Sequence, residues 1–169
     1  MSSLPPEQLL ERWLTLHGAL IHRILRAYAF TSEDRADLLQ EIALQLWDSI
    51  PRFRGAAGET TWIYRVTLYS ALSWSGKERK HKLGREPLAH PPLAPDTTAK
   101  AEDPRLAWIY EQLATLDPID RSLLLMQLDG QTYQSIATTL GFSVEKVGTR
   151  LHRLKNNLAR RFEERGPKQ

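Results

Sequence analysis

Apolar residues recur at helical spacing through the first eighty residues of the chain. One such row predicts a helix over Pro5–Phe30, with its apolar face at Leu9, Trp13, Leu16, Leu20, Ile24 and Tyr28. Thr31 and Ser32 are candidate caps for a second helix that ends near Pro51. The apolar positions of this second helix are Leu39, Ile42, Leu46 and Ile50, with Leu38 beside them. A third helix is expected from about Thr60 to Arg79.

The pattern stops between residues 83 and 102, where no period is visible. This stretch contains Pro87, Pro91, Pro92 and Pro95, a composition typical of an extended linker. A structureless loop of this length is improbable inside a compact domain. The sequence therefore predicts two domains joined by a tether.

Helical periodicity resumes after the linker and predicts four more helices. They are expected over Asp103–Leu116, Pro118–Asp129, Thr132–Leu140 and Ser143–Glu164. Asp117 followed by Pro118 is a helix-start signal, and Gly130 and Gly141 are natural helix stops. Neither half alternates long enough to indicate a sheet. The expected fold is all-α, with helical domains at 5–82 and 103–165 and a Pro-rich linker at 83–102.

Composition narrows the function classes. The chain has 169 residues, 41% hydrophobic and 25% charged, as is ordinary for a globular protein. It has no cysteine, which excludes disulfides and thiolate metal sites and fits a reducing compartment. Neither a signal peptide nor a run of roughly 20 apolar residues is present, so we expect a cytoplasmic protein without membrane insertion. The five histidines do not group, and no phosphate loop or nucleophile motif occurs, so we expect no enzyme, cofactor or metal.

The segment TYQSIATTLGFSVEKVGTRLHRL, residues 132–154, has the pattern of a helix-turn-helix. Between Val144 and Arg165 lie seven Lys or Arg and three Glu, an excess of +4, while the whole chain carries only +3. Such a helix alone could be a solvated amphipathic end of the chain. The preceding small-residue helix and the short glycine turn favour DNA binding.

Two patterns in the first half suggest further partners. An acidic row on the second helix comprises Asp34, Asp37, Glu41, Gln45 and Asp48. The row is either a solvated face or a docking surface for a protein. Aromatic and basic residues interleave from Arg52 to Trp74, followed by KERKHK, a pattern suited to stacking unpaired bases and holding phosphates. Trp62, Val66 and Tyr69 fit either this role or a place in the core.

Together these residues resemble the sigma-70 family of bacterial transcription initiation factors, most closely its two-domain extracytoplasmic function (ECF) group. DLLQEIALQLWDSIPRF resembles the core-binding part of region 2, and FRG followed by TWIYRV resembles the segment that melts the minus-ten promoter element. The stretch from LDPIDRS to KNNL resembles region 4, which reads the minus-thirty-five element. The resemblance covers about Leu9 to Arg161 in the family's order.

The resemblance implies a role for each matching residue. Core RNA polymerase, through the clamp helices of its largest subunit, would be bound by Asp37, Gln40, Glu41 and Asp48. The minus-ten element would be captured and melted by Phe53, Arg54, Thr61, Trp62, Tyr64, Arg65, Tyr69, Ser73, Lys77, Arg79 and Lys80. The duplex minus-thirty-five element would be bound by Thr132, Ser143, Lys146, Thr149, Arg150 and Arg153. The linker would thread toward the polymerase active-site channel, and family members are often silenced by an anti-sigma factor.

Some positions depart from the family pattern. The family often has asparagine and another polar residue where this chain has Tyr69 and Ser73, and often lysine where it has Gly148. Two alternative functions therefore stay open beside a sigma subunit. One is a polymerase-independent helix-turn-helix regulator, and the other is a sigma-like adaptor that has lost promoter melting.

Overall fold

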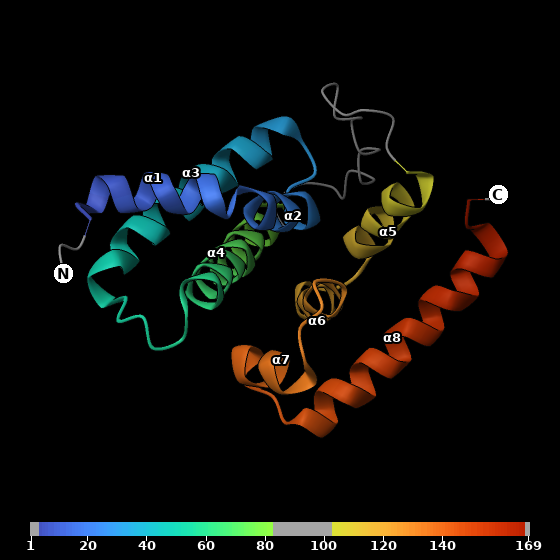
Figure 1. Cartoon of the computed structure of the whole chain (residues 1–169). Coiled ribbons are helices and arrows are strands. Elements are labelled where there is room, and N and C mark those ends of the chain that lie inside the picture. The colour runs from blue at the N-terminus through green and yellow to red at the C-terminus, as the bar shows by residue number, and fades with distance from the viewer. Residues whose placement is uncertain (1–3, 83–102, 168–169) are drawn as a thin grey trace. The chain divides into compact units, whose positions relative to one another are not determined.

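The computed structural model describes residues 4–82 and 103–167, and these fall into two compact units, one on each side of the predicted linker (Figure 1). The described ranges contain eight α-helices and one short 3-10 turn, and they contain no strand. The predicted all-α class is confirmed. The linker at 83–102, and with it the expected path toward the polymerase channel, lies outside the described residues.

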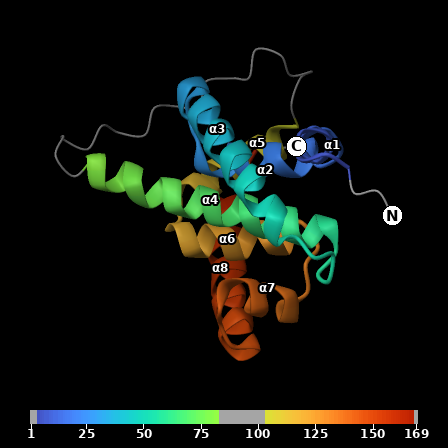
Figure 2. The same ribbon diagram turned by 90° about the vertical axis from the view of Figure 1, so that its left-hand side faces the viewer.

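The first unit is a bundle of four helices. Its elements are α1 (Pro6–Leu16), α2 (Gly18–Tyr28), α3 (Ser32–Ser49), the 3-10 turn η1 (Ile50–Arg52) and α4 (Glu59–Lys82). The long α4 packs against both α2 and α3, and α1 closes the bundle against α2 and α3 (Figures 1 and 2). The apolar stripes of the four helices therefore meet in one core.

That core is made of fully buried side chains from all four helices. The largest are Trp13, Ile24, Tyr28, Leu38, Ile42, Leu46, Ile63 and Leu68. Burying each of these contributes roughly 1.5–3 kcal/mol relative to exposure. On α3 the prediction misplaced one position: Leu38 is buried, whereas Leu39 is 42% exposed. The inward face of α3 therefore runs through Leu38, Ile42 and Leu46, and Leu39 lies outside it.

The predicted single helix over Pro5–Phe30 is wrong, because the chain breaks at His17 into α1 and α2. His17 leaves the helical region (φ −106°, ψ 15°), and Gly18 begins α2. Glycine weakens a helix because its backbone is the most flexible of all residues. Breaking the helix at this point therefore costs little free energy. The break turns α2 so that its own apolar face reaches the core, and it leaves Leu16 exposed.

The second unit contains the four helices expected from the sequence. They are α5 (Pro104–Thr115), α6 (Pro118–Leu128), α7 (Tyr133–Leu140) and α8 (Val144–Arg165). The central helix α6 packs against α5, α7 and α8, and α7 packs against α8. Figure 1 shows α8 as the long helix that runs past the other three. Its inward face is made by Val147, Leu151 and Leu154.

Side-chain caps fix where these helices begin and end. Asp117 accepts hydrogen bonds from two backbone N–H groups at the start of α6, as the Asp–Pro signal predicted. At the end of α5, the buried Arg121 donates to the carbonyls of Leu113, Ala114 and Leu116 at 2.9–3.3 Å. A cation at a helix C-terminus is favourable because it satisfies carbonyls that have no partner within the helix. Arg121 therefore sets the α5–α6 corner.

Candidate nucleic-acid interface

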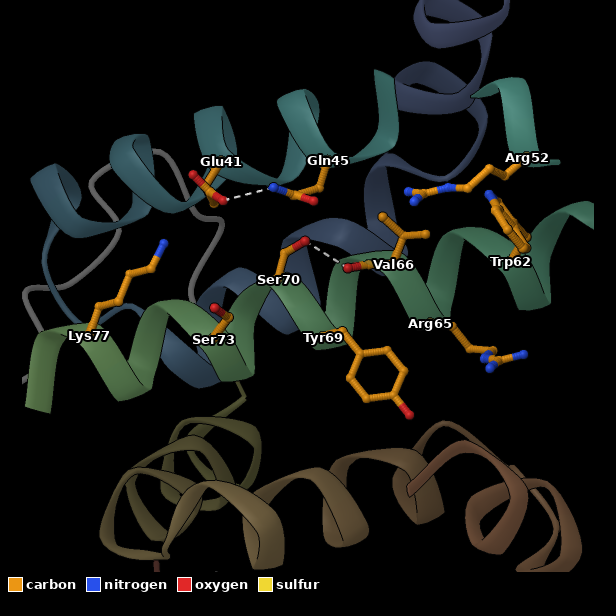
Figure 3. A pocket seen from close by; sticks show the side chains of 10 residues that line it. All are labelled: Glu41, Gln45, Arg52, Trp62, Arg65, Val66, Tyr69, Ser70, Ser73 and Lys77. Atoms are coloured by element: carbon orange, nitrogen blue, oxygen red, sulfur yellow. Dashed lines mark hydrogen bonds between the residues drawn. The ribbon is translucent and has the colours of Figure 1, made fainter. Parts of the chain in front are cut away.

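A groove of about 360 Å³ lies between α3 and α4 in the first unit (Figure 3). Its walls are Glu41 and Gln45 from α3, Arg52 from η1, and a face of α4 made by Trp62, Arg65, Val66, Tyr69, Ser70, Ser73 and Lys77. The α4 residues share a face because they are spaced three or four apart along the helix. The groove thus combines two aromatic rings, three cations and one carboxylate.

The aromatic rings at one end of the groove are held by packing and hydrogen bonds. Trp62 donates its indole N–H to the hydroxyl of Ser49 at 3.1 Å. Phe53 lies between two indoles, with ring centroids 5.4 Å from Trp13 and 5.8 Å from Trp62. Tyr69 is more exposed, at 46%. The ring of Trp62 is therefore held in place, whereas Tyr69 presents part of its ring at the surface of the groove.

Five residues of the sequence-predicted minus-ten set meet in this groove: Trp62, Arg65, Tyr69, Ser73 and Lys77. Trp62, Val66 and Tyr69, which the sequence could assign either to the core or to a binding surface, are all partly exposed and line the groove.

The remaining members of the set lie elsewhere. Arg54 and Thr61 are exposed outside the groove lining, and the side chains of Arg79 and Lys80 lie outside the described part of the chain. Tyr64 is buried, with only 5% of its surface exposed. It directly follows the inward-facing Ile63, so helical geometry turns both toward the core.

Gln45 and Arg52 line the groove but do not belong to the DNA-binding residues predicted from the sequence. Glu41, which also lines it, was predicted to dock on polymerase. Gln45 donates its side-chain amide N–H to the carboxylate of Glu41 at 3.1 Å, one helical turn away. Both side chains point into the groove (Figure 3). The i, i+4 spacing could have paired these two residues, but only the packing of α4 against α3 shows that they share a groove with it.

The rest of the acidic row of α3 remains on the surface. Asp37, Gln40 and Asp48 are exposed. Gln40 also borders a second, mainly apolar groove of about 570 Å³. The walls of this second groove come from α1, α2 and α3, and include Leu14, Ile21, Leu25, Leu39 and Ala43. Of the predicted docking residues, Gln40 therefore adjoins this mainly apolar surface.

The loop between η1 and α4 is braced at its far end by α1. Gly55 and Gly58 adopt positive φ angles of 74° and 73°, which only glycine adopts without strain. Glu59, the first residue of α4, has both carboxylate oxygens 3.0 Å from Nη2 of Arg12. His17 Nε2 lies 3.3 Å from one of them. The break after α1 thus brings His17 beside the loop.

In the second unit, α7, the Gly141 turn and α8 form a helix-turn-helix. Gly141 has a φ of 70° and ends α7 in the left-handed conformation, as expected of a glycine stop. Thr132 caps α7 by accepting a hydrogen bond from the backbone N–H of Ser135 at 3.1 Å. Ser143 caps α8 by accepting one from the backbone N–H of Lys146 at 3.2 Å. Two of the three hydroxyl side chains in the predicted minus-thirty-five set therefore act as helix caps. Lys146, Thr149 and Arg153 are exposed on α8.

Arg150 is held by carboxylates within the protein. It contacts Asp120 of α6 through Nε at 2.8 Å and Nη2 at 2.6 Å, and Asp117 lies 4.0 Å away. Arg153 reaches the other oxygen of Asp120 at 3.7 Å. Side-chain exposure is 25% for Arg150, 10% for Asp120 and 62% for Arg153. Arg150 is consequently fixed in place, while Arg153 is largely free to reach outward.

The pKa values of Asp120 and Asp117 are shifted in opposite directions. Burial raises the pKa of Asp120 above its usual value, and the neighbouring Asp117 raises it further, against the opposing effect of Arg150. Burial also acts to raise the pKa of Asp117. The backbone N–H groups of Asp120 and Ile119, together with Arg150, outweigh burial and lower the pKa of Asp117 overall. Arg150 thus favours the charged form of both groups.

Gly148, in the middle of α8, faces the ring of Tyr133 from α7. A Cβ at this position would lie 3.6 Å from the ring, an ordinary van der Waals distance. Lys155 donates to the phenol oxygen of Tyr133 at 3.4 Å. The aromatic ring therefore covers the part of α8 that lacks a side chain.

Within residues 4–82 and 103–167, no three His, Asp or Glu side chains cluster as metal ligands would. None of the helices described there is both long and apolar enough to cross a bilayer.

Two family models match the chain: sigma-70 region 2 over residues 13–81, and sigma-70 region 4 over residues 106–158. The RNA polymerase sigma factor YlaC of Bacillus subtilis (strain 168) is 28% identical over 145 residues, which cover 78% of this chain and 82% of that protein. The ECF RNA polymerase sigma factor SigM of Mycobacterium tuberculosis (strain ATCC 25618 / H37Rv) is 29% identical over 147 residues, or 85% and 72% of the two chains.

Solved structures share the fold at lower sequence identity. CnrH, in complex with the cytosolic domain of CnrY, matches with a TM-score of 0.65 and 18% identity, over 94% of this chain and 90% of that one. The sigma factor RpoE of Bartonella quintana, in complex with the anti-sigma factor NepR, matches with a TM-score of 0.68 and 17% identity, over 90% and 96%.

Proposed function

Because the chain belongs to the sigma-70 family of RNA polymerase sigma factors, in its ECF group, we propose a division of labour between its two units. As an ECF sigma factor the protein directs promoter recognition by RNA polymerase and is not itself an enzyme. Residues 5–82 dock on core polymerase and hold the opened minus-ten strand. Residues 103–165 bind the duplex minus-thirty-five element, and residues 83–102 connect the two, in the cytoplasm where polymerase works.

The observation that carries this proposal is the groove between α3 and α4. Unpaired bases are bound by aromatic faces next to cations that track the phosphate chain. The groove offers Trp62 and Tyr69 as faces, with Arg52, Arg65 and Lys77 as cations. Stacking contributes about 1–3 kcal/mol per base without sequence preference. A double helix gains little from such rings, because its bases are already stacked on one another.

Docking on polymerase is assigned to the exposed side of α3. Asp37, Gln40 and Asp48 give this side polar anchors, and Leu39 gives it apolar area beside the second groove. Exposed apolar patches rimmed by polar groups are typical of protein interfaces. The two solved relatives are bound to CnrY and to the anti-sigma factor NepR. We infer that this chain is held inactive by binding an anti-sigma factor.

Duplex binding is assigned to the outer face of α8. Lys146, Thr149 and Arg153 are exposed there, and Lys146 lies 4.1 Å above the ring of Phe142. Arginine and lysine can read guanine edges or hold phosphates, and phosphate contacts make affinity fall with salt. Arg150, on the same helix, is held against Asp120 of α6.

The experiment that tests the division of labour separates the two binding activities. Asp37→Arg should weaken binding of the full chain to core polymerase at least tenfold and leave binding to duplex promoter DNA unchanged. Arg153→Ala should do the reverse and reduce the slope of duplex affinity against salt concentration by about one. Equal losses of both activities in either variant would contradict the assignment.

A further inference from the structure

Two side chains from outside α8 hold the guanidinium of Arg150. Its Nε and Nη2 atoms lie 2.8 and 2.6 Å from Oδ1 of Asp120, which projects from α6. Its Cζ atom lies 5.8 Å from the centre of the Phe142 ring, in the turn before α8, within the range of a cation–π contact. Side-chain exposure is 10% for Asp120 and 25% for Arg150. The guanidinium is therefore held in one orientation.

The contacts with Asp120 use one edge of that guanidinium. Arginine carries five N–H donors in a planar fork, and Nε together with one hydrogen of Nη2 forms its side edge. Asp120 accepts from this side edge. The end of the fork, formed by Nη1 and the second hydrogen of Nη2, can still donate to another acceptor. Two donors side by side match the two acceptors on the major-groove edge of guanine, O6 and N7.

Charge around Arg150 favours a base edge over a phosphate. A phosphate that approaches Arg150 also meets the negative charge of Asp120, which offsets the attraction. Arg153 is placed differently, because its side chain is 62% exposed and lies 3.7 Å from the second oxygen of Asp120. A mobile, exposed arginine suits a phosphate, whereas a fixed and partly neutralised one suits the uncharged edge of a base.

We propose that Asp120 is a positioning residue for promoter recognition, which presents Arg150 to the edge of one base pair and withholds it from the phosphates. This role rests on the proposed binding of duplex DNA by the second unit. It adds a residue of α6, outside the helix-turn-helix, to the set that determines sequence preference. Without the charge of Asp120, Arg150 regains its rotational freedom and its full attraction to phosphates. Base selection then falls while the salt dependence of binding rises, a combination that loss of structural support alone does not produce.

The test measures base selection and salt dependence for the full chain on duplex DNA randomised over about ten base pairs. Bound duplexes are sequenced for the wild type and for Asp120→Asn, which keeps the shape and one acceptor but removes the charge. The wild type should prefer guanine about tenfold at one position, the discrimination of a single good base contact. Asp120→Asn should lose that preference, and its affinity should fall more steeply with salt, by about one unit of slope.

Two further variants locate the effect. Arg150→Lys keeps a cation beside Asp120 but lacks the planar fork, so it should lose the preference at the same position. This variant tests the same contact even if Asp120→Asn does not fold. Asp117→Asn is the matched control, because it removes a charge 4.0 Å from Arg150 and keeps a residue suited to the N-cap of α6. Its base selection should equal that of the wild type.

The outcomes separate this role from the proposed function. Weaker binding by Asp120→Asn with an unchanged base profile and salt slope would mean that Asp120 only supports the fold, and would overturn the positioning role alone. A preference that survives in Arg150→Lys would also overturn it, since Arg150 would then not read that base. If the wild-type chain selects no duplex sequence, the proposed function of the second unit fails, and the role of Asp120 fails with it.

Discussion

Replacing Arg150 with alanine should destabilise the second unit as well as weaken its DNA binding. The guanidinium makes two contacts of 2.8 and 2.6 Å with Asp120, whose side chain is only 10% exposed. A hydrogen bond to a charged group contributes roughly 1.5–3 kcal/mol, and losing it leaves the carboxylate without its closest cation. Because Arg150 itself is 25% exposed, we expect a cost of about 2 kcal/mol, below the range for a fully buried pair.

Hydrogen exchange of the full chain measures this cost where it arises. Backbone amides of α6 and α8 should exchange about 30-fold faster in Arg150→Ala, the factor that corresponds to about 2 kcal/mol. Arg153→Ala is the matched control, because Arg153 is 62% exposed and 3.7 Å from the same carboxyl group. Its exchange should change by less than about threefold, as surface ion pairs contribute little. Equal exchange rates in the two variants would refute the assigned role of Arg150.

The pH dependence gives an independent check. Burial raises the folded-state pKa of Asp120, so its contribution to stability is present below its unfolded pKa and is lost as pH rises through the folded pKa. Removing Arg150 takes away the effect that opposes this rise, and the cost of the charged form grows. The deficit of Arg150→Ala should therefore shrink as pH falls through the raised pKa of Asp120. A deficit independent of pH would mean that Asp120 is not its source.

Three further substitutions probe the local geometry. Gly148→Ala should stabilise α8 by up to about 1 kcal/mol in thermal unfolding, because the new methyl would sit 3.6 Å from the ring of Tyr133; a destabilised variant would contradict this. Ser143→Ala should cost about 1 kcal/mol through loss of the α8 cap, and an unchanged unfolding temperature would argue against that cap. Arg12→Ala should speed amide exchange in the loop before Glu59 while costing less than about 1 kcal/mol overall, and unaltered loop exchange would exclude the brace.

Helix positions in the second unit could be predicted from the sequence because their signals are local. Asp117 before a proline, Thr132 and Ser143 as caps, and Gly141 as a stop each act within four residues of themselves. The break at His17 could not be predicted in the same way. The apolar row runs through it without interruption, and only packing of α2 against the other helices decides that the chain must turn there.

The candidate site likewise has parts that could be predicted from the sequence and parts that could not. The α4 face from Trp62 to Lys77 follows from helical spacing and was predicted. The positions of Glu41 and Arg150 could not be predicted in this way. Each depends on packing against a second helix, and the sequence does not show how the two helices pack together. Tyr64 shows the converse: an aromatic residue inside a matching motif is turned inward by the register of α4.

Run-off transcription with core polymerase, the purified full chain and DNA fragments carrying candidate promoters tests whether the protein acts as a sigma subunit. We expect discrete transcripts that require both the chain and an upstream duplex element, and that are lost when Trp62 and Tyr69 are both replaced by alanine. Binding to core polymerase without transcripts would instead support a sigma-like adaptor. Binding to duplex DNA without binding to core polymerase would contradict a sigma function and support an independent regulator.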